Sequence, residues 1–305
     1  MRSLADTLRF MYPNLEISDT LERGEGEHKM FQWIRKFPPG ERKRICLYGL
    51  DADLVLIAIA QHDLGNIQIL REKEKDTGFA TISIPELMKV LPADPETYVR
   101  MSILCFGNDF LPNFAMFSLR EDGYPRAVHY MKTTGMKGAA DDEQKVLRKR
   151  AKVGPIVSED GHEIETRMGI HIMDGVLNWE PVVYAFKKTF EWTLHYFKTS
   201  EVLDWHWYYP YPEAPLVATW EAYEFSTPFV WEHPEPLYTI EDQLRFILPE
   251  ESLNKTGLVS THPDELYDEE TETRSLWMKR FPWESDPWVS LPWGKLTTVG
   301  AYVPP

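Results

Sequence analysis

Cysteine is scarce in this sequence. Two cysteines occur among 305 residues, and both Cys46 and Cys105 lie in short apolar runs that are typical of buried strands. They form no cysteine-based zinc pattern, and a pair in such positions is more typical of core thiols than of a disulfide. We therefore expect an intracellular protein of a reducing compartment, cytoplasmic or nuclear.

Several other signals are also missing. The sequence has no N-terminal signal pattern and no run of about 18 apolar residues, so it predicts neither secretion nor a membrane span. It has no phosphate-binding GxxxxGK[ST] loop, no GxSxG nucleophile elbow and no internal repeat. These absences argue against P-loop enzymes, serine hydrolases of the elbow type and solenoid proteins.

The sequence also has no excess of basic residues. The chain has 33 Lys and Arg residues against 48 Asp and Glu residues, which gives a net charge of −15. This balance argues against a surface that coats nucleic acid, but it leaves room for a local basic groove or for carboxylates neutralised by metal ions. A hydrophobic content of 43%, including 13% aromatics, predicts a globular protein with a sizeable core.

The stretch ICLYGLDADLVL, residues 45–56, is the most informative part of the chain. Its first half predicts a buried strand, Gly49 ends that strand, and Asp51 and Asp53 follow directly. Ligands of open α/β sheets bind beyond the carboxyl ends of the strands, so both acids point to a binding site. The alternative is a simple strand–helix junction in which Asp53 caps the following helix.

Two other places carry acids in suggestive surroundings. Glu25 and Glu27 are separated by Gly26 in the loop GEGEHK, where close backbone approach would let both carboxylates converge on one cation. The alternative is electrostatic stabilisation of the helix that follows. Asp109, in GNDFLP, comes after another strand-like run and can join these pairs, or it can serve as an ordinary turn residue.

The remaining patterns predict a mixture of helices and short strands. Apolar spacing predicts an amphipathic helix at the N-terminus and a longer helix between Trp179 and Tyr196. The predicted helices cover residues 1–12, 30–37, 54–60, 85–91, 179–196 and 240–248, and the predicted strands cover residues 15–17, 45–48, 67–70 and 103–106.

Composition divides the chain into three parts. Residues 1–130 contain the strands and acids, residues 131–167 form a polar and basic linker with one helix, and residues 168–305 are helical and rich in Trp and Pro. The basic helix either faces RNA or is a solvated surface. The aromatic run at residues 205–212 either stacks on unpaired bases or packs within the protein.

Five segments together resemble the Xrn family of 5′→3′ exoribonucleases. In chain order they are GEGEHK, YGLDADL, LREKE, GNDFLP and WHWYYPYPEAP, with weaker similarity continuing to EDQLRFILP. The resemblance covers residues 22–249, except for a poorly matched stretch at 131–167. It implies an α/β nuclease core of the PIN and flap-endonuclease kind, followed by a helical and irregular Trp/Pro-rich region.

The resemblance also assigns roles to particular residues. It implies that five acids bind two divalent cations, Mg²⁺ or Mn²⁺, and carry the catalysis: Glu25, Glu27, Asp51, Asp53 and Asp109. Two such ions would activate a water and stabilise the leaving oxygen of a phosphodiester. Three further residues are expected to bind RNA: Lys29, Trp205 and Trp207.

One departure from the family pattern is large. Further metal-binding aspartates and the basic pocket for the RNA 5′-phosphate lie upstream of GEGEHK in the family, whereas about twenty residues precede it here. The chain therefore corresponds to the C-terminal half of the conserved nuclease region. We expect a second chain or protein partner to supply the N-terminal half.

Three hypotheses follow for the function. The first is a metal-dependent exoribonuclease that degrades 5′-monophosphorylated single-stranded RNA together with a complementing N-terminal half. The second is a catalytically inactive structural or interaction protein derived from the same fold. The third is a flap-type nuclease acting on DNA, against which the Trp-rich continuation argues. Because a purely structural descendant has little reason to keep repelling carboxylates together, the five acids favour the first.

Overall fold

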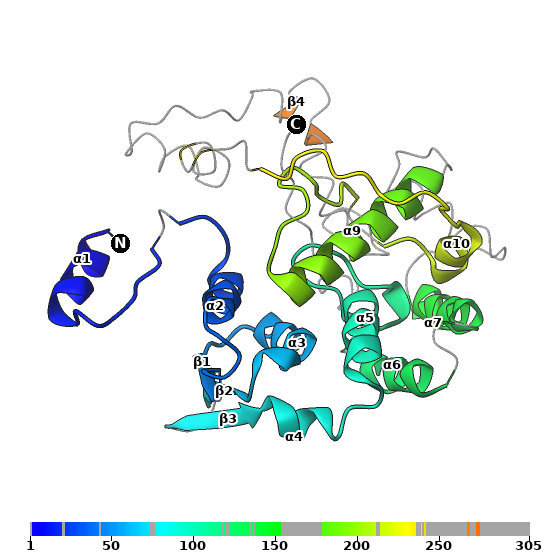
Figure 1. Ribbon diagram of the computed structural model, residues 1–305. Coiled ribbons are helices and arrows are strands. Elements are labelled where there is room, and N and C mark those ends of the chain that lie inside the picture. The colour runs from blue at the N-terminus through cyan, green and yellow to red at the C-terminus, as the bar shows by residue number, and fades with distance from the viewer. Residues whose placement is uncertain are drawn as a thin grey trace.

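The computed structural model is described here for most of the chain up to residue 241 (Figure 1). The described residues are 2–19, 22–42, 44–73, 77–117, 119, 122–133, 136, 138–153, 179–211, 214–235, 239, 241, 267–268 and 273–274. Two predicted features, the helix at 240–248 and the second half of the linker at 154–167, lie outside the described residues apart from residue 241.

A three-stranded sheet in the order β1-β2-β3 carries the central acid pair. Strand β1 (Ile45–Tyr48) pairs in parallel with β2 (Ile67–Glu72), with Ile45 opposite Ile67, and β2 pairs antiparallel with β3 (Phe79–Ser83). The predicted strands at 45–48 and 67–70 are therefore confirmed. Strand β3 was missed, because its residues are mostly exposed and show no apolar alternation.

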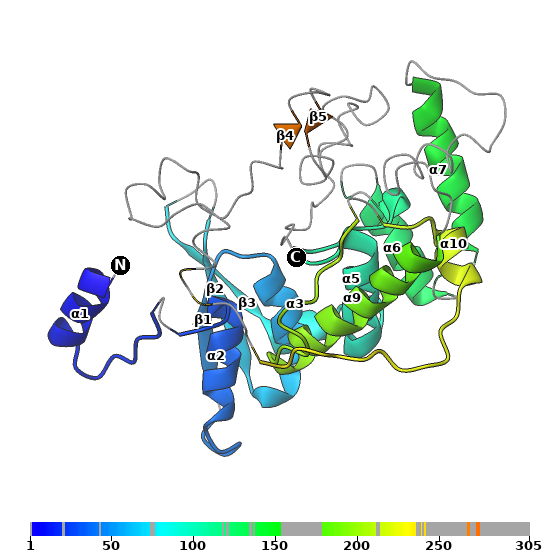
Figure 2. The same cartoon turned by 90° about the horizontal axis from the view of Figure 1, so that it is seen from above.

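Helix α3 (Asp53–Ala60) connects β1 to β2, as parallel strands require. Its sequence is apolar on all sides, which is typical of a helix that is enclosed by other elements. Figures 1 and 2 show α3 between the sheet and the helices α5 (Pro95–Phe106) and α9 (Glu180–Thr199). The acid pair at the start of α3 is thus placed by a fully packed element.

The prediction of a strand at residues 103–106 is wrong. These residues form the last turns of α5, which begins where the Asp94 carboxylate accepts a hydrogen bond from the Thr97 N–H at 3.0 Å. Pro95 occupies the first helical position, where its missing N–H costs nothing. The apolar run was ambiguous because a buried helix end and a buried strand have the same composition.

Helix α9 confirms the predicted helix at 179–196, and its C-terminus is tied to the sheet region. Gln32 and Arg35 of α2 (Gly26–Arg35) donate to the carbonyls of Ser200 and Thr199 at 2.5 and 2.7 Å. The buried Gln61 side chain donates to the Phe197 carbonyl at 2.8 Å. These side chains satisfy carbonyls that the helix end leaves without partners.

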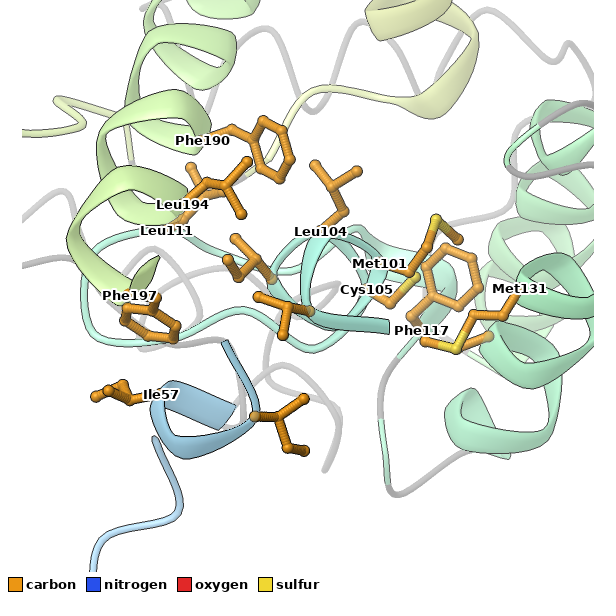
Figure 3. Packing of buried hydrophobic residues seen from close by; sticks show 14 of the residues in the cluster. Ile57, Met101, Leu104, Cys105, Leu111, Phe117, Met131, Phe190, Leu194 and Phe197 are labelled. Carbon is orange, nitrogen blue, oxygen red and sulfur yellow. The ribbon is translucent and has the colours of Figure 1, made fainter. Parts of the chain in front are cut away.

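One hydrophobic cluster extends from α2 through α3 and α5 to α9 and α10 (Val217–Ala222). Figure 3 shows Leu104 of α5 pointing toward Phe190 and Leu194 of α9, while Met101 and Cys105 face Phe117 and Met131. The acid-bearing first part of the chain and the later helical part therefore share a core. The predicted division at residues 130 and 167 stays a prediction.

Helix α1 (Arg2–Met11) confirms the predicted N-terminal helix, whereas the strand predicted at residues 15–17 is absent from the described chain. Cys46 is exposed, contrary to prediction, because it lies on the side of β1 that no described element covers; Cys105 is buried as expected. The other elements are η1 (His62–Leu64), α4 (Ile84–Met88), η2 (Ala115–Phe117), α6 (Gly123–Lys132), α7 (Ala139–Val153), β4 (Tyr267–Asp268) and β5 (Thr273–Arg274).

Helix α7 lies within the stretch predicted as a linker. Ala139 at its start is buried, and the Glu143 carboxylate accepts a hydrogen bond from the Val217 N–H of α10 at 2.6 Å. The first half of the stretch thus contacts the body of the protein. Among the described residues, none of the helices has the length and apolar character needed to cross a membrane.

Candidate functional site

Asp51 and Asp53 lie at the carboxyl end of β1, where a tight turn leads into α3. The Asp51 carboxylate accepts a hydrogen bond from the Asp53 N–H at 2.9 Å, so Asp51 rather than Asp53 stabilises the beginning of the helix. A Cβ at Gly49 would lie 2.6 Å from a terminal methyl of the Leu54 side chain, so that side chain would have to move to admit a larger residue. Arg71 of β2 donates to the Leu50 carbonyl and further holds the turn.

Glu25 and Glu27 lie at the beginning of α2. Glu25 has an extended backbone and directly precedes the first helical residue. Its carbonyl accepts the first helical hydrogen bond, from the Lys29 N–H at 3.0 Å. Gly24 before it has φ +95°, a conformation that favours glycine. The Glu25 side chain is 52% exposed and makes no capping bond to its own helix, so its carboxylate is not used to stabilise that helix.

Asp109 is carried by a loop that begins where α5 ends. Gly107 has φ +68°, and a Cβ there would lie 2.8 Å from the backbone of Leu111 and Asn113. The buried Asn108 side chain accepts from the N–H groups of Phe110 and Leu111 at 2.9 and 3.1 Å. This closed loop leaves Asp109 exposed toward the other acids.

Electrostatic interactions link the five acids, which come from three separate segments. Partial burial, together with Asp109, Glu27 and Asp53, raises the pKa of Glu25 to about 7. Partial burial, together with Asp51, Asp109 and Glu27, raises the pKa of Asp53 to about 6. Carboxylates from three segments therefore repel one another across a shared space.

This donor set fits hard divalent cations, because all five side chains offer carboxylate oxygens and their repulsion is relieved by positive charge. Within the residues described above, however, no three Asp, Glu, His or Cys side chains are close enough to form a ready-made metal site. Coordination therefore requires side-chain rearrangement around the ion.

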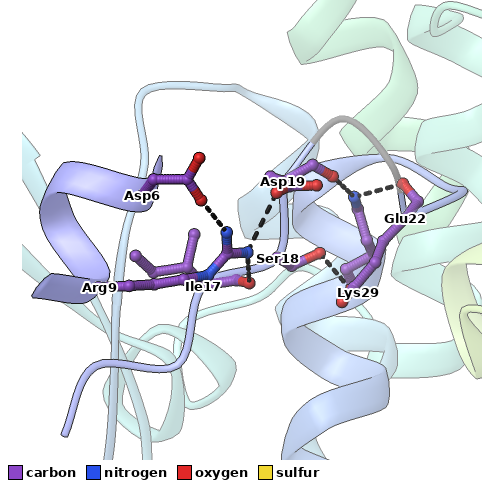
Figure 4. A network of polar contacts seen from close by, with 7 residues as sticks. All are labelled: Asp6, Arg9, Ile17, Ser18, Asp19, Glu22 and Lys29. Atoms are coloured by element: carbon purple, nitrogen blue, oxygen red, sulfur yellow. Dashed lines mark hydrogen bonds and ion pairs between the residues drawn. The ribbon is translucent and has the colours of Figure 1, made fainter. Parts of the chain in front are cut away.

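Lys29 is occupied by the loop that precedes the glutamates. Its ammonium donates to the carbonyls of Glu22 at 2.8 Å and Asp19 at 3.4 Å (Figure 4). Arg9 of α1 holds the other side of the same loop through the Asp19 carboxylate at 3.0 Å and the Ile17 carbonyl. In this arrangement Lys29 positions the loop, and its predicted role in RNA binding stays a prediction.

The two tryptophans predicted to bind RNA differ in their surroundings. Trp205 is 36% exposed, and its backbone N–H donates to the His233 carbonyl at 2.8 Å. Trp207 is half-buried: the Lys188 ammonium lies 4.0 Å from its ring centroid, and its indole N–H donates to Thr189 at 3.0 Å. Trp205 is thus the more accessible of the two for stacking.

Asp204 fixes the backbone around Trp205, and we expect its removal to destabilise the protein by about 2 kcal/mol or more. This carboxylate is 3% exposed and accepts from the N–H groups of His206 and Glu232 at 2.9 and 3.0 Å. Burial opposes its ionised form, but the backbone hydrogen bonds and His233 outweigh burial and lower its pKa. An Asp204→Ala variant removes the acceptor of both hydrogen bonds.

The pH dependence of this effect follows from the sign of the shift. A lowered folded-state pKa stabilises the protein above the unfolded value of about 4, and this contribution is lost as the pH falls below it. Urea unfolding measures the free energy of unfolding of the wild type and of Asp204→Ala. The difference between the two proteins should be large at pH 7 and smaller at pH 3. Asp63→Ala, at an exposed site, is the control. An equal loss of unfolding free energy in Asp204→Ala and Asp63→Ala would contradict the prediction.

Two residues at this site had no role assigned from the sequence. Tyr196 of α9 interacts with Glu25, and His28 of α2 stacks on the Tyr196 ring with a centroid distance of 3.4 Å. His28 stood inside the GEGEHK motif, but its burial was not visible from the motif. Tyr196 lies 171 positions from Glu25, and no pattern in the sequence relates the two.

Comparison with known proteins gives partial similarity. A family model described as XRN 5′-3′ exonuclease N-terminus matches residues 4–73. The chain is 33% identical over 134 residues to 5′-3′ exoribonuclease 2 of Yarrowia lipolytica, covering 34% of this chain and 13% of that protein. It is 47% identical over 60 residues to 5′-3′ exoribonuclease 2 of Arabidopsis thaliana, covering 18% and 6%.

A longer match is of lower identity. The chain is 26% identical over 238 residues to 5′-3′ exoribonuclease 2 of Neurospora crassa, covering 57% of this chain and 20% of that protein. The chain thus spans a fifth or less of the length of these curated relatives. Together the matches support a relationship to the Xrn family, as the motifs indicate, while the correspondence to a C-terminal half of its nuclease region stays a prediction.

Proposed function

We propose that this chain is a 5′→3′ exoribonuclease-like protein that hydrolyses RNA phosphodiesters with two divalent cations. The observation that carries the proposal is the coupling of Glu25, Glu27, Asp51, Asp53 and Asp109, which lie in three separate segments. Similarity to proteins named 5′-3′ exoribonuclease 2 supports the choice of reaction. A PIN-like nuclease core is part of this proposal.

The five acids would hold Mg²⁺ or Mn²⁺. Such ions supply Lewis-acid activation of water and stabilisation of charge on the leaving oxygen. The protein's own contribution is to place the carboxylates on packed elements, at the start of α2, at the start of α3 and on the closed loop after α5. Trp205 and Lys29 are proposed to contact the RNA, which carries a 5′-monophosphate.

A complementing polypeptide segment is also part of the proposal. Strand β1 is an edge strand of the described sheet, and Cys46 and Tyr48 on it are exposed. An open edge beside a site of this kind is suited to pairing with a further strand. The alternative function is an inactive Xrn-derived structural or interaction protein, which the net charge of −15 favours because an acidic surface repels RNA.

The experiment is degradation of a 3′-labelled single-stranded RNA with a 5′-monophosphate. We expect metal-dependent loss of the RNA from its 5′ end, complete inhibition by a chelator, and recovery on addition of Mn²⁺. A 5′-hydroxyl RNA of the same sequence is the control and should persist. If the wild-type chain degrades neither RNA, even with a supplied N-terminal segment of a 5′-3′ exoribonuclease, the inactive alternative replaces the proposal.

A further inference from the structure

Tyr196 connects the later helical part of the chain to the acid cluster. It lies near the end of α9, is 4% exposed, and faces the beginning of α2. Its hydroxyl interacts with both the carboxylate and the backbone N–H of Glu25. One phenol therefore holds both the main chain and the side chain of a single acid.

Other aromatic rings hold this phenol in place. His28, 2% exposed, stacks on the Tyr196 ring with an interplanar angle of 14°, and Trp192 packs beside it at a centroid distance of 5.0 Å. Phe110 meets Tyr196 edge-on at 5.7 Å and Trp192 at 4.9 Å. We call His28, Phe110, Trp192 and Tyr196 the aromatic cluster. Its packing restricts the phenol to a narrow range of positions.

The aromatic cluster reaches two of the three acid-bearing segments. His28 follows Glu27 directly, and Phe110 follows Asp109 directly. Any displacement of the rings therefore moves both segments relative to each other. Glu25 itself needs such support, because it lies between two glycines and its side chain makes no capping bond to its own helix.

The buried imidazole has little capacity to replace the phenol. His28 Nε2 lies 3.9 Å from the Glu25 carboxylate, beyond hydrogen-bonding distance, and its Nδ1 has no hydrogen-bond partner among the described residues. The histidine thus acts on Glu25 through the ring on which it stacks. The direct polar contact belongs to Tyr196.

We propose that Tyr196 is a positioning residue for the metal site: its hydroxyl orients the Glu25 carboxylate toward the space shared with Asp53 and Asp109. This inference rests on the proposed function, because it presumes that those acids bind metal. Outer partners that orient a ligand typically change metal affinity 10- to 100-fold when they are removed. The helical part of the chain thereby becomes part of the catalytic apparatus.

The test measures Mn²⁺ binding by electron paramagnetic resonance of the free aqueous ion. Tyr196→Phe removes the hydroxyl and keeps the stacked ring, and we expect about 10-fold weaker binding with unchanged circular dichroism. Tyr130→Phe is the matched control, because it removes a buried hydroxyl that donates to Asp142 at 2.6 Å, away from the acids. It should bind Mn²⁺ as the wild type does.

A double-variant comparison separates positioning from a general loss of packing. Glu25→Gln should weaken Mn²⁺ binding, and adding Tyr196→Phe to it should cause little further loss. An undiminished effect of Tyr196→Phe in the Glu25→Gln background would contradict the inference, as would normal binding by Tyr196→Phe alone. If neither the wild type nor the variants bind Mn²⁺, the proposed function itself fails, and the inference fails with it.

Discussion

Replacing Asp53 with asparagine is expected to reduce RNA hydrolysis by about a thousandfold, while the folded protein becomes no less stable. Asp53 interacts electrostatically with Asp51, Asp109 and Glu27, so it is in contact with the field of the other acids of the proposed site. Losing one charged ligand of a catalytic metal removes several kcal/mol of transition-state stabilisation, and each 1.4 kcal/mol corresponds to about a factor of ten in rate.

The stability of the same variant should move in the opposite direction. Without metal, the Asp53 carboxylate is partly buried among like charges, which destabilise the folded state. An uncharged amide of equal size relieves this repulsion, so the free energy of unfolding at pH 7 should stay equal or rise. Residues that serve function at the expense of stability behave in this way.

The measurement pairs single-turnover RNA degradation with urea unfolding in the absence of metal. Asp63→Asn is the matched control, since this aspartate lies just beyond α3 on an exposed position. It should leave both quantities unchanged. Full activity of Asp53→Asn, or its clear destabilisation, would show that Asp53 serves the fold and not the chemistry.

Phe197→Ala should cost about 3–5 kcal/mol of unfolding free energy, which is a large part of the stability of an ordinary domain. Phe197 is 1% exposed and lies against Ile57 of α3, where α9 meets the acid-bearing helix (Figure 3). Truncation leaves a cavity at this junction that the surrounding helices cannot fill. Because Tyr196 is its neighbour, Mn²⁺ binding should weaken as well.

Phe10→Ala provides the control for this prediction. Phe10 lies on α1 and is 89% exposed, so truncation should change the unfolding free energy by less than about 0.5 kcal/mol. Urea unfolding followed by tryptophan fluorescence compares the two variants directly. Equal effects would mean that the junction between α9 and α3 contributes little to the stability of the described core.

The acids and the regular elements around them were largely predictable. A β-prone run, a glycine and two aspartates placed Asp51 and Asp53 at the junction of β1 and α3, because these signals act over a few neighbouring residues. Apolar spacing likewise predicted α9 with its buried positions, including Val182, Phe186 and Phe190. Local pattern failed at residues 103–106, where a buried helix end and a buried strand look alike.

By itself, the sequence determined which residues are proposed to carry the chemistry and most of the elements that bear them, since both depend on short-range pattern and motif. Only the tertiary structure decided how these residues meet. The coupling of Glu25 with Asp53 and Asp109, and the contact of Glu25 with Tyr196, depend on packing between segments far apart in the chain. Such contacts are set by the shared core of α2, α3, α5 and α9, which no local pattern encodes.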